Sequence, residues 1–316
     1  MFRAYSTSLA PSLILFVQLR PSEYGTYTFF TFLSEDTLLI PNLVQNALEV
    51  TKIVIESDDT PRLMPLCVLH LPPLTRHASI IGLICRSEPN PTGSGPVAIP
   101  APSHRPFRNR PEDAIIVFSL SIEGVRHRDF FSQQTRFLET RPFTFIVHRC
   151  ALLAHIPAAH RACPPFCFAP EHTPAQVPWD VWGVSATRWF EGDPASMRWI
   201  TTTAGQRSVT MEDGAPTPVI VRDFNSYAVR AACALATASG PWQQGNWSKQ
   251  LPNGNRMTLK VEDDVISAGS IFEEDVRSSL PYVEIVTRAE YDYDGVLIDE
   301  ERILGLKVCP ESLLYR

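Results

Sequence analysis

A cluster of cysteine and histidine residues is the first candidate for chemistry in this chain. Five of them fall within the eighteen residues of "HIPAAHRACPPFCFAPEH", at His155, His160, Cys163, Cys167 and His172. A zinc ion needs four such donors at the corners of a tetrahedron, so the residue types suit this metal. The Cys-x3-Cys spacing is unusual for zinc, however, and two prolines stiffen the turn between the cysteines. We therefore favour a proline-rich loop, with a metal site in 155–172 as the alternative.

The acidic segment "EYDYDGVLIDEE" at 290–301 is a candidate calcium loop. If Gly295 takes the sixth position of an EF-hand loop, acidic residues fall at positions one, three, five and twelve, namely Glu290, Asp292, Asp294 and Glu301. An EF-hand needs a helix on each side, whereas the flanking runs "YVEIVTR" and "ILGLKV" are typical of strands. Asp294-Gly295 between extended runs indicates a hairpin turn, which is the interpretation that we adopt.

Catalytic signatures are missing from the sequence. The nearest approach to a G-x-S-x-G nucleophile elbow is "GVSAT" at 183–187, and there is neither a P-loop nor a G-x-G-x-x-G after a strand. We therefore predict a protein that is not an enzyme, with no catalytic residues, cofactor or metal. The alternative is a hydrolase or lyase whose residues are dispersed along the chain and converge at the central channel of a propeller.

The stretch "VPWDVWGVSATRWF" at 177–190 is rich in aromatic residues. Its Trp179-Asp180 pair is not a WD40 signature, because no Gly-His precedes it at repeat distance and nothing repeats it. We expect its large side chains to wedge between neighbouring sheets as a structural joint, formed by Trp179, Trp182, Arg188, Trp189 and Phe190. Arg188 is expected to stack on an indole or to pair with an acid. The alternative is that the edge of this stretch binds a partner.

A second tryptophan-bearing stretch, "ASGPWQQGNWSKQLPNGN" at 238–255, reads as a polar loop. Tryptophans on loops often contribute to protein interfaces, so Trp242 and Trp247 are the candidate partner-binding residues. Indole also has a large apolar area to bury, and the favoured interpretation is that both side chains fold back over the core.

The charge and composition of the chain exclude several classes of protein. A net charge of -6 and a pI near 5.8 leave no large positive field, so nucleic acid is not an expected partner. The apolar run near the N-terminus is too short to span a bilayer and contains Pro11, which predicts a strand rather than a signal or membrane segment. The odd count of seven cysteines favours reduced thiols. We expect a cytoplasmic or nuclear protein with no membrane contact.

Strand-like runs recur along the whole chain, and many of them alternate with period two. They are "YTFFTFL" (27–33), "TLLIP" (37–41), "ALEVTKIVI" (47–55), "LCVLHL" (66–71), "SIIGLICRS" (79–87), "AIIVFSLSI" (114–122), "FTFIVHR" (143–149), "PVIVRDF" (218–224), "RMTLKVE" (256–262), "YVEIVTR" (282–288) and "ILGLKV" (303–308). Helical signal is sparse. The best candidate is 225–237, where Asn225 or Ser226 can cap the helix and Gly240-Pro241 ends it.

The fold class that follows is all-β with one or two short helices. Length favours an irregular β-propeller-like domain, because a sandwich of 316 residues needs large insertions; a large sandwich or barrel is the alternative. We expect a short N-terminal extension over 1–28 and a single domain over 29–316, with a Pro/Gly/Ser-rich loop at 88–112. Blade number and oligomeric state are not determined by the sequence.

The aromatic stretch, together with "RWITTTAGQRSV" and "PVIVRDFN", resembles a lineage-specific family of mushroom-type fungal F-box domain-containing proteins, in the region after the F-box. The resemblance continues in order over most of 29–308. Upstream it includes "TFLSEDTLLIPN", "ALEVTKI", "LCVLHLPPL", "CRSEPNP", "IIVFSLSI" and "FIVHRCALL". Downstream it includes "IFEEDVRSSLPYVEIVT" and "YDGVLIDEERILGLKV".

The resemblance implies a propeller-like β domain that receives substrate for a cullin-type ubiquitin ligase, with the F-box docking on a Skp1-type adaptor. Residues 1–28 are too short for the three helices of an F-box, so a Skp1 partner is expected only if the full gene product carries one. The expected function is a non-enzymatic protein-interaction domain, a substrate receptor or scaffold, with a protein partner of unknown identity. A degenerate family copy without a retained role is a further alternative.

Overall fold

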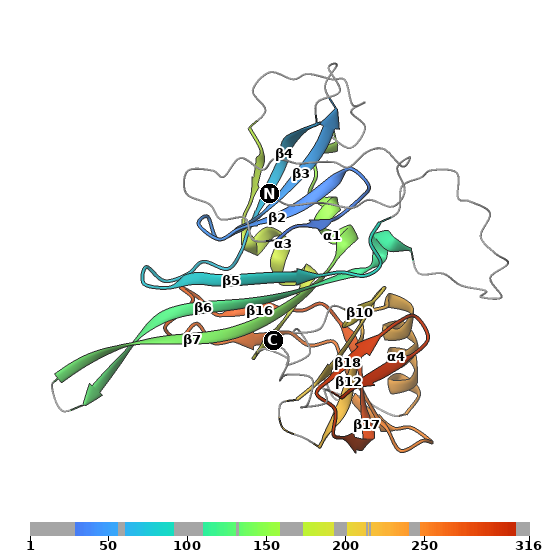
Figure 1. Ribbon diagram of the computed structural model, residues 1–316. Helices are drawn as coiled ribbons and strands as arrows, with labels where there is room; N and C mark the ends of the chain where they lie inside the picture. The colour runs from blue at the N-terminus through green and yellow to red at the C-terminus, as the bar shows by residue number, and fades with distance from the viewer. Residues whose placement is uncertain are drawn as a thin grey trace, which may run out of the picture.

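The computed structural model describes residues 29–55, 61–91, 110–130, 133–158, 173–192, 201–212, 214, 216–239 and 247–307 (Figure 1). This part of the chain is mostly β structure, arranged in several open sheets with short helices between them. The mostly-β prediction is confirmed. The propeller-like arrangement is not found, because no described sheet closes into a propeller or barrel. Propeller blades are small four-stranded sheets around one axis, whereas these sheets have two to six strands and open edges.

Sheet 1 comes mainly from the N-terminal part of the described chain. Its order is β1 (Thr31–Phe32), β2 (Thr37–Asn42), β3 (Ala47–Ile55), β4 (Pro61–His70) and β8 (Ala175–Val177). Neighbouring strands are antiparallel except for β8, which runs parallel to β4. Strand β3 begins and ends where the alternating sequence of 47–55 predicts, since a period of two places its apolar residues on one face of the pleat.

Sheet 2 faces sheet 1 across the main hydrophobic core. Its order is β5 (Ser79–Arg86), β6 (Ile115–Phe130), β7 (Gln133–His148) and β9 (Thr187–Glu191), all antiparallel. Leu48 and Leu69 of sheet 1 share this core with Phe118 and Phe145 of sheet 2, whose rings stack at 4.4 Å between centroids. Burial of these apolar side chains is the main term that holds the two sheets together.

Sheet 3 and helix α4 form the C-terminal part of the fold (Figure 1). The strand order is β10 (Thr203–Ala204), β11 (Arg207–Met211), β12 (Thr217–Asp223), β17 (Tyr282–Tyr291), β14 (Arg256–Lys260) and β13 (Trp247–Gln250). Helix α4 (Ser226–Ala238) packs on β14 and β17 through Val229 and Leu259. The helix prediction is confirmed: the Asn225 side chain accepts a hydrogen bond from the Tyr227 N–H at 2.8 Å, as an N-cap does.

Two short ribbons complete the described strands. They are β15 (Asp264–Ile266) with β16 (Val276–Ser278), and β18 (Gly295–Ile298) with β19 (Ile303–Leu306). The prediction of a hairpin turn at Asp294-Gly295 is wrong. Gly295 begins strand β18, and the hairpin turn lies after Ile298, between β18 and β19. The Asp299 side chain stabilises this turn, because it accepts hydrogen bonds from the N–H groups of Glu301 and Arg302. Such local side-chain hydrogen bonds favour a turn over continued strand pairing.

Candidate functional site

The aromatic stretch at 177–190 connects the edges of sheets 1 and 2. Strand β8 ends at Val177, helix α3 (Trp179–Ala186) follows, and β9 begins at Thr187. Sequence reasoning missed this helix, because eight residues with two tryptophans and a glycine give no clear amphipathic period. Pro178 precedes the first helical residue, and the chain returns to extended backbone at Thr187. The stretch therefore carries the chain from one sheet to the other.

Trp182 and Trp189 of this stretch are buried in the main core, and the partly buried Trp179 packs against them. The Trp179 ring meets those of Trp182 and Trp189 edge-on, at 5.2 and 5.7 Å between centroids. Trp189 also stacks on Phe145 at 4.8 Å, and Trp182 donates its indole N–H to the His70 carbonyl at 2.8 Å. Each edge-on pair contributes about 1 kcal/mol beyond the burial of its area.

Arg188 is fully buried where sheet 2 meets the C-terminal part of the fold. Its Nε donates to the Leu280 carbonyl at 2.8 Å, and its Nη1 donates to the Glu262 carbonyl at 2.9 Å and to Asp264 Oδ2 at 2.8 Å. The guanidinium lies 5.3 Å from the Tyr282 ring centroid. The arginine thus pairs with an acid and lies over a phenol ring rather than an indole.

The remaining predicted residues are dispersed. Phe190 is half-buried against the smaller core between sheets 2 and 3, with Arg222 4.3 Å from its ring centroid. Trp247 lies on β13 and packs against the α4 core. Trp242 lies outside the described residues, and so do 159–172 of the Cys/His-rich segment. Among the residues that are described, no three Cys, His, Asp or Glu side chains converge on a metal position.

The feature that sequence reasoning missed is an arm formed by β6 and β7. Both strands have sixteen residues, but β5 pairs with β6 only as far as Glu123, and β9 pairs with β7 only from Phe143. From the pair Gly124 and Glu139 outward, the two strands pair only with each other among the described strands. Figure 1 shows this ribbon extending beyond the rest of sheet 2. We call residues 124–130 and 133–139 the arm.

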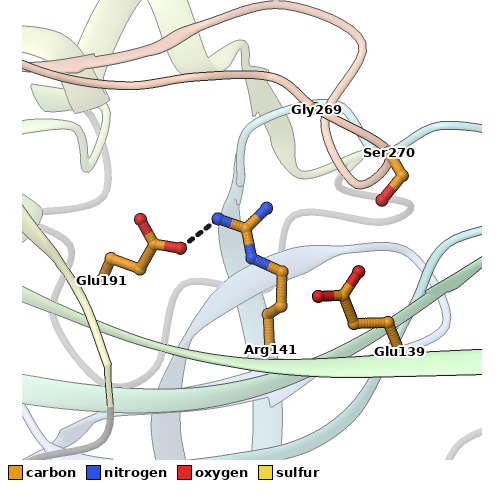
Figure 2. Close-up of a pocket in the computed structure, with 5 residues that line it drawn as sticks. All are labelled: Glu139, Arg141, Glu191, Gly269 and Ser270. Atoms are coloured by element: carbon orange, nitrogen blue, oxygen red, sulfur yellow. Dashed lines mark hydrogen bonds and ion pairs between the residues drawn. The ribbon is translucent and has the colours of Figure 1, made fainter. Parts of the chain in front are cut away.

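A shallow polar pocket of about 390 Å³ lies at the base of the arm. It is lined by Glu139, Arg141, Glu191, Gly269 and Ser270, and we call it the arm-base pocket (Figure 2). Arg141 forms an ion pair with Glu191, and Figure 2 shows the Glu139 carboxylate on the other side of the arginine. The Arg141 guanidinium also lies 5.3 Å from the Phe143 ring centroid.

The wall of the pocket opposite β7 is a well-fixed loop. The Ser270 carbonyl accepts a hydrogen bond from Thr75 Oγ1 at 3.0 Å, and the Ile271 carbonyl accepts one from the Thr75 N–H at 2.9 Å. Gly269 has a φ of 57°, a left-handed conformation that favours glycine, and a Cβ there would lie 3.4 Å from Arg141 Nη1. The pocket is therefore built on fixed backbone, which gives its charged groups defined positions.

The charges of the pocket suit a cationic group. Two carboxylates and one guanidinium line it, so the ionised lining carries a net charge of -1. Arg141 is mostly covered, with 23 % of its side chain exposed, whereas the Glu191 side chain is 59 % exposed. Carboxylate oxygens accept hydrogen bonds from ammonium and guanidinium donors, so an incoming lysine or arginine can donate to the carboxylates that line the pocket beside Arg141.

Sequence reasoning also missed the buried Arg149 at the start of helix α1 (Arg149–Ala154). Its guanidinium donates to the Pro89 carbonyl at 3.2 Å, to the Pro111 carbonyl, and to Ser87 Oγ at 2.6 Å. Burial lowers its pKa to about 10, against the opposing effects of Glu112 and Glu88. An arginine among apolar residues was the available signal, because such a side chain is buried only with partners.

Comparison with known proteins identifies no relative: no family model, curated protein or solved structure matches the chain. Within the described residues, no helix combines the length and the apolar sequence that crossing a bilayer requires.

Proposed function

We propose that this chain is a non-enzymatic protein-interaction domain that presents the β6–β7 arm to a protein partner. The observation that carries the proposal is the run of paired residues from Gly124 and Glu139 to Phe130 and Gln133, which has no other described strand beside it. A two-stranded ribbon is marginally stable in water, and its unpaired backbone groups are ready to pair with another chain. A strand from a partner would stabilise the ribbon and pair with its free backbone groups.

The exposed apolar surface of the arm supports the same function. Leu138 is 70 % exposed on β7 and is not among the described residues that form the main core. The base of the arm at Gly124, by contrast, packs closely against the loop at 270–271. A Cβ added to Gly124 would lie only 3.2 Å from Ile271 Cγ1 and 3.4 Å from the Ser270 carbonyl oxygen. A projecting element on a fixed base is a common way to present a binding surface.

The experiment that tests this function is removal of the arm. Residues 125–138 are replaced by Asn-Gly, the turn that best joins two strands at the directly paired Gly124 and Glu139. Cross-linking and affinity purification from cells expressing the full chain should recover a reproducible partner that the trimmed chain loses. Urea unfolding of the trimmed chain is the control that sheet 2 is retained. Equal recovery by both chains, or no reproducible partner, contradicts the proposal.

The resemblance to F-box proteins adds a narrower version, in which the domain is a substrate receptor or scaffold of a cullin-type ubiquitin ligase. It is supported by the ordered segments over 29–308 and does not require a closed propeller. Purification of the full gene product tests it, because a Skp1-type adaptor is expected together with the substrate only if that product carries an F-box. An F-box-bearing product that recovers reproducible partners without the adaptor excludes the ligase version and leaves the interaction function in place.

A further inference from the structure

Among the described residues, no strand pairs with the outer edge of β7 between Pro142 and the tip of the arm. The Gly192 N–H donates to the Pro142 carbonyl at 2.9 Å, and Gly192 takes a φ of 104°, a conformation outside the strand region. In an antiparallel strand the N–H and C=O of one residue point to one edge, and alternate residues share that edge. Because β6 and β7 pair without a bulge, Thr140 and Leu138 point their backbone groups to the edge that Pro142 shares with β9.

The two faces of β7 beside this edge differ in chemistry. Glu139 and Arg141 share a face with the buried Phe143 and line the arm-base pocket. Leu138 is on the opposite face and is 70 % exposed. A strand added to this edge would therefore have acidic and apolar surfaces on alternate sides.

We infer that the outer edge of β7 pairs with an extended segment of a partner protein in which apolar residues alternate with lysine or arginine. Backbone groups of the segment pair with Thr140 and Leu138, as in other cases of strand addition. A basic side chain enters the arm-base pocket, whose net charge is -1, and an apolar side chain covers Leu138. The net charge of -6 over the whole chain attracts such a segment. This inference rests on the proposed function and names the chemistry of its partner.

The test begins with a phage-displayed library of random dodecapeptides selected against the full chain. Enriched sequences should alternate apolar residues with lysine or arginine. The most enriched sequence is then synthesised, and its Kd is measured by fluorescence anisotropy. Leu138→Pro should weaken binding at least fivefold, roughly the value of one backbone hydrogen bond, because it removes an N–H from the outer edge. Proline is tolerated there, since that N–H takes no part in pairing with β6.

Val125→Pro is the matched control. Val125 is directly opposite Leu138, and both residues of such a pair point their backbone groups away from each other. The control thus removes one N–H from the other edge of the same arm and should leave the Kd unchanged. A paired charge test uses Glu139→Gln with Glu191→Gln. The double variant should weaken binding of the basic peptide about fivefold and leave a version with methionine in place of lysine or arginine unaffected.

Three results would overturn the inference. The first is a library with no enriched sequence, and the second is equal affinity of the peptide for Leu138→Pro and Val125→Pro. The third is self-association of the full chain, detected by sedimentation and abolished by Leu138→Pro, because it would assign the edge to a second copy of the chain. The proposed function fails separately. A cellular partner that needs the arm yet still binds Leu138→Pro excludes edge pairing and leaves the interaction function. If the full chain recovers no partner that depends on the arm, both the proposed function and the inference fail.

Discussion

Arg188 donates a hydrogen bond from Nε to the Leu280 carbonyl at 2.8 Å, so one fully buried side chain ties sheet 2 to the segment that leads into β17. The backbone reinforces this contact, because the Leu280 N–H donates to the Thr187 carbonyl at 2.9 Å. The residues of 177–190 thereby meet sheet 1, sheet 2 and the C-terminal strands. That these residues act as a structural joint stays a prediction, which the variants below test.

Replacing Arg188 by methionine should lower the free energy of unfolding by about 2 to 4 kcal/mol, because the Leu280 carbonyl, in a buried contact, and the Glu262 carbonyl, in a partly buried one, lose their charged donor. The control is Asp264→Asn. Asp264 is half exposed and Arg188 keeps both carbonyl partners, so the loss should be about 1 kcal/mol or less. Urea unfolding measures both. Equal losses in the two variants would show that the ion pair, rather than the carbonyl contacts, carries the stability.

Gly183→Ala should destabilise the protein although alanine favours helix. A Cβ at 183 would lie 2.0 Å from the Trp179 ring, which is held edge-on against Trp182 and Trp189. Overpacking costs about 1 to 3 kcal/mol and outweighs the gain in helix propensity of about 1 kcal/mol. Gly82→Ala is the control, because its Cβ has ordinary contact with Ser121 at 3.9 Å. Thermal unfolding should show a lower Tm only for Gly183→Ala; an unchanged or raised Tm there contradicts the argument.

Arg149→Met should lower the free energy of unfolding by about 2 to 4 kcal/mol, since the Pro89 and Pro111 carbonyls lose a buried donor. Arg149→Lys should recover little of this loss, because one ammonium cannot reproduce the arginine fork. Arg230, exposed on α4, provides the matched control in Arg230→Met, which should change stability by less than about 0.5 kcal/mol. Full rescue by lysine in urea unfolding would mean that charge alone matters.

Stability should fall as the pH rises from 10 toward 12, partly because of Tyr282. Burial raises the pKa of Tyr282 to about 12, and Glu284 adds to the rise. Between pH 10 and 12 the unfolded chain loses this proton and the folded chain keeps it, so the stabilisation present below pH 10 is lost. Tyr282→Phe should make the decline shallower in urea unfolding at pH 8, 10 and 11. Tyr227→Phe, at a side chain that is 75 % exposed, should leave the slope unchanged; equal effects of both variants contradict the assignment.

The sequence by itself determined the mostly-β class, many strand positions and helix α4. These features follow from local rules. Alternation over 47–55 defines a strand, and Asn225 caps the helix through a hydrogen bond that does not depend on tertiary packing. Helix α3 escaped prediction because its sequence has no clear period. The hairpin turn was predicted at Asp294-Gly295, but it forms after Ile298. There the Asp299 side chain accepts hydrogen bonds from two backbone N–H groups, and these stabilise the later turn.

Only the tertiary structure decided how the sheets are arranged and where the arm and the arm-base pocket lie. Strand order depends on contacts between distant residues, and no local pattern shows that β5 and β9 stop short of the ends of β6 and β7. The arm exists because of that difference in length. The arm-base pocket likewise combines β7, β9 and the loop at 269–270, whose charged and polar groups are far apart in the sequence and meet only through the fold.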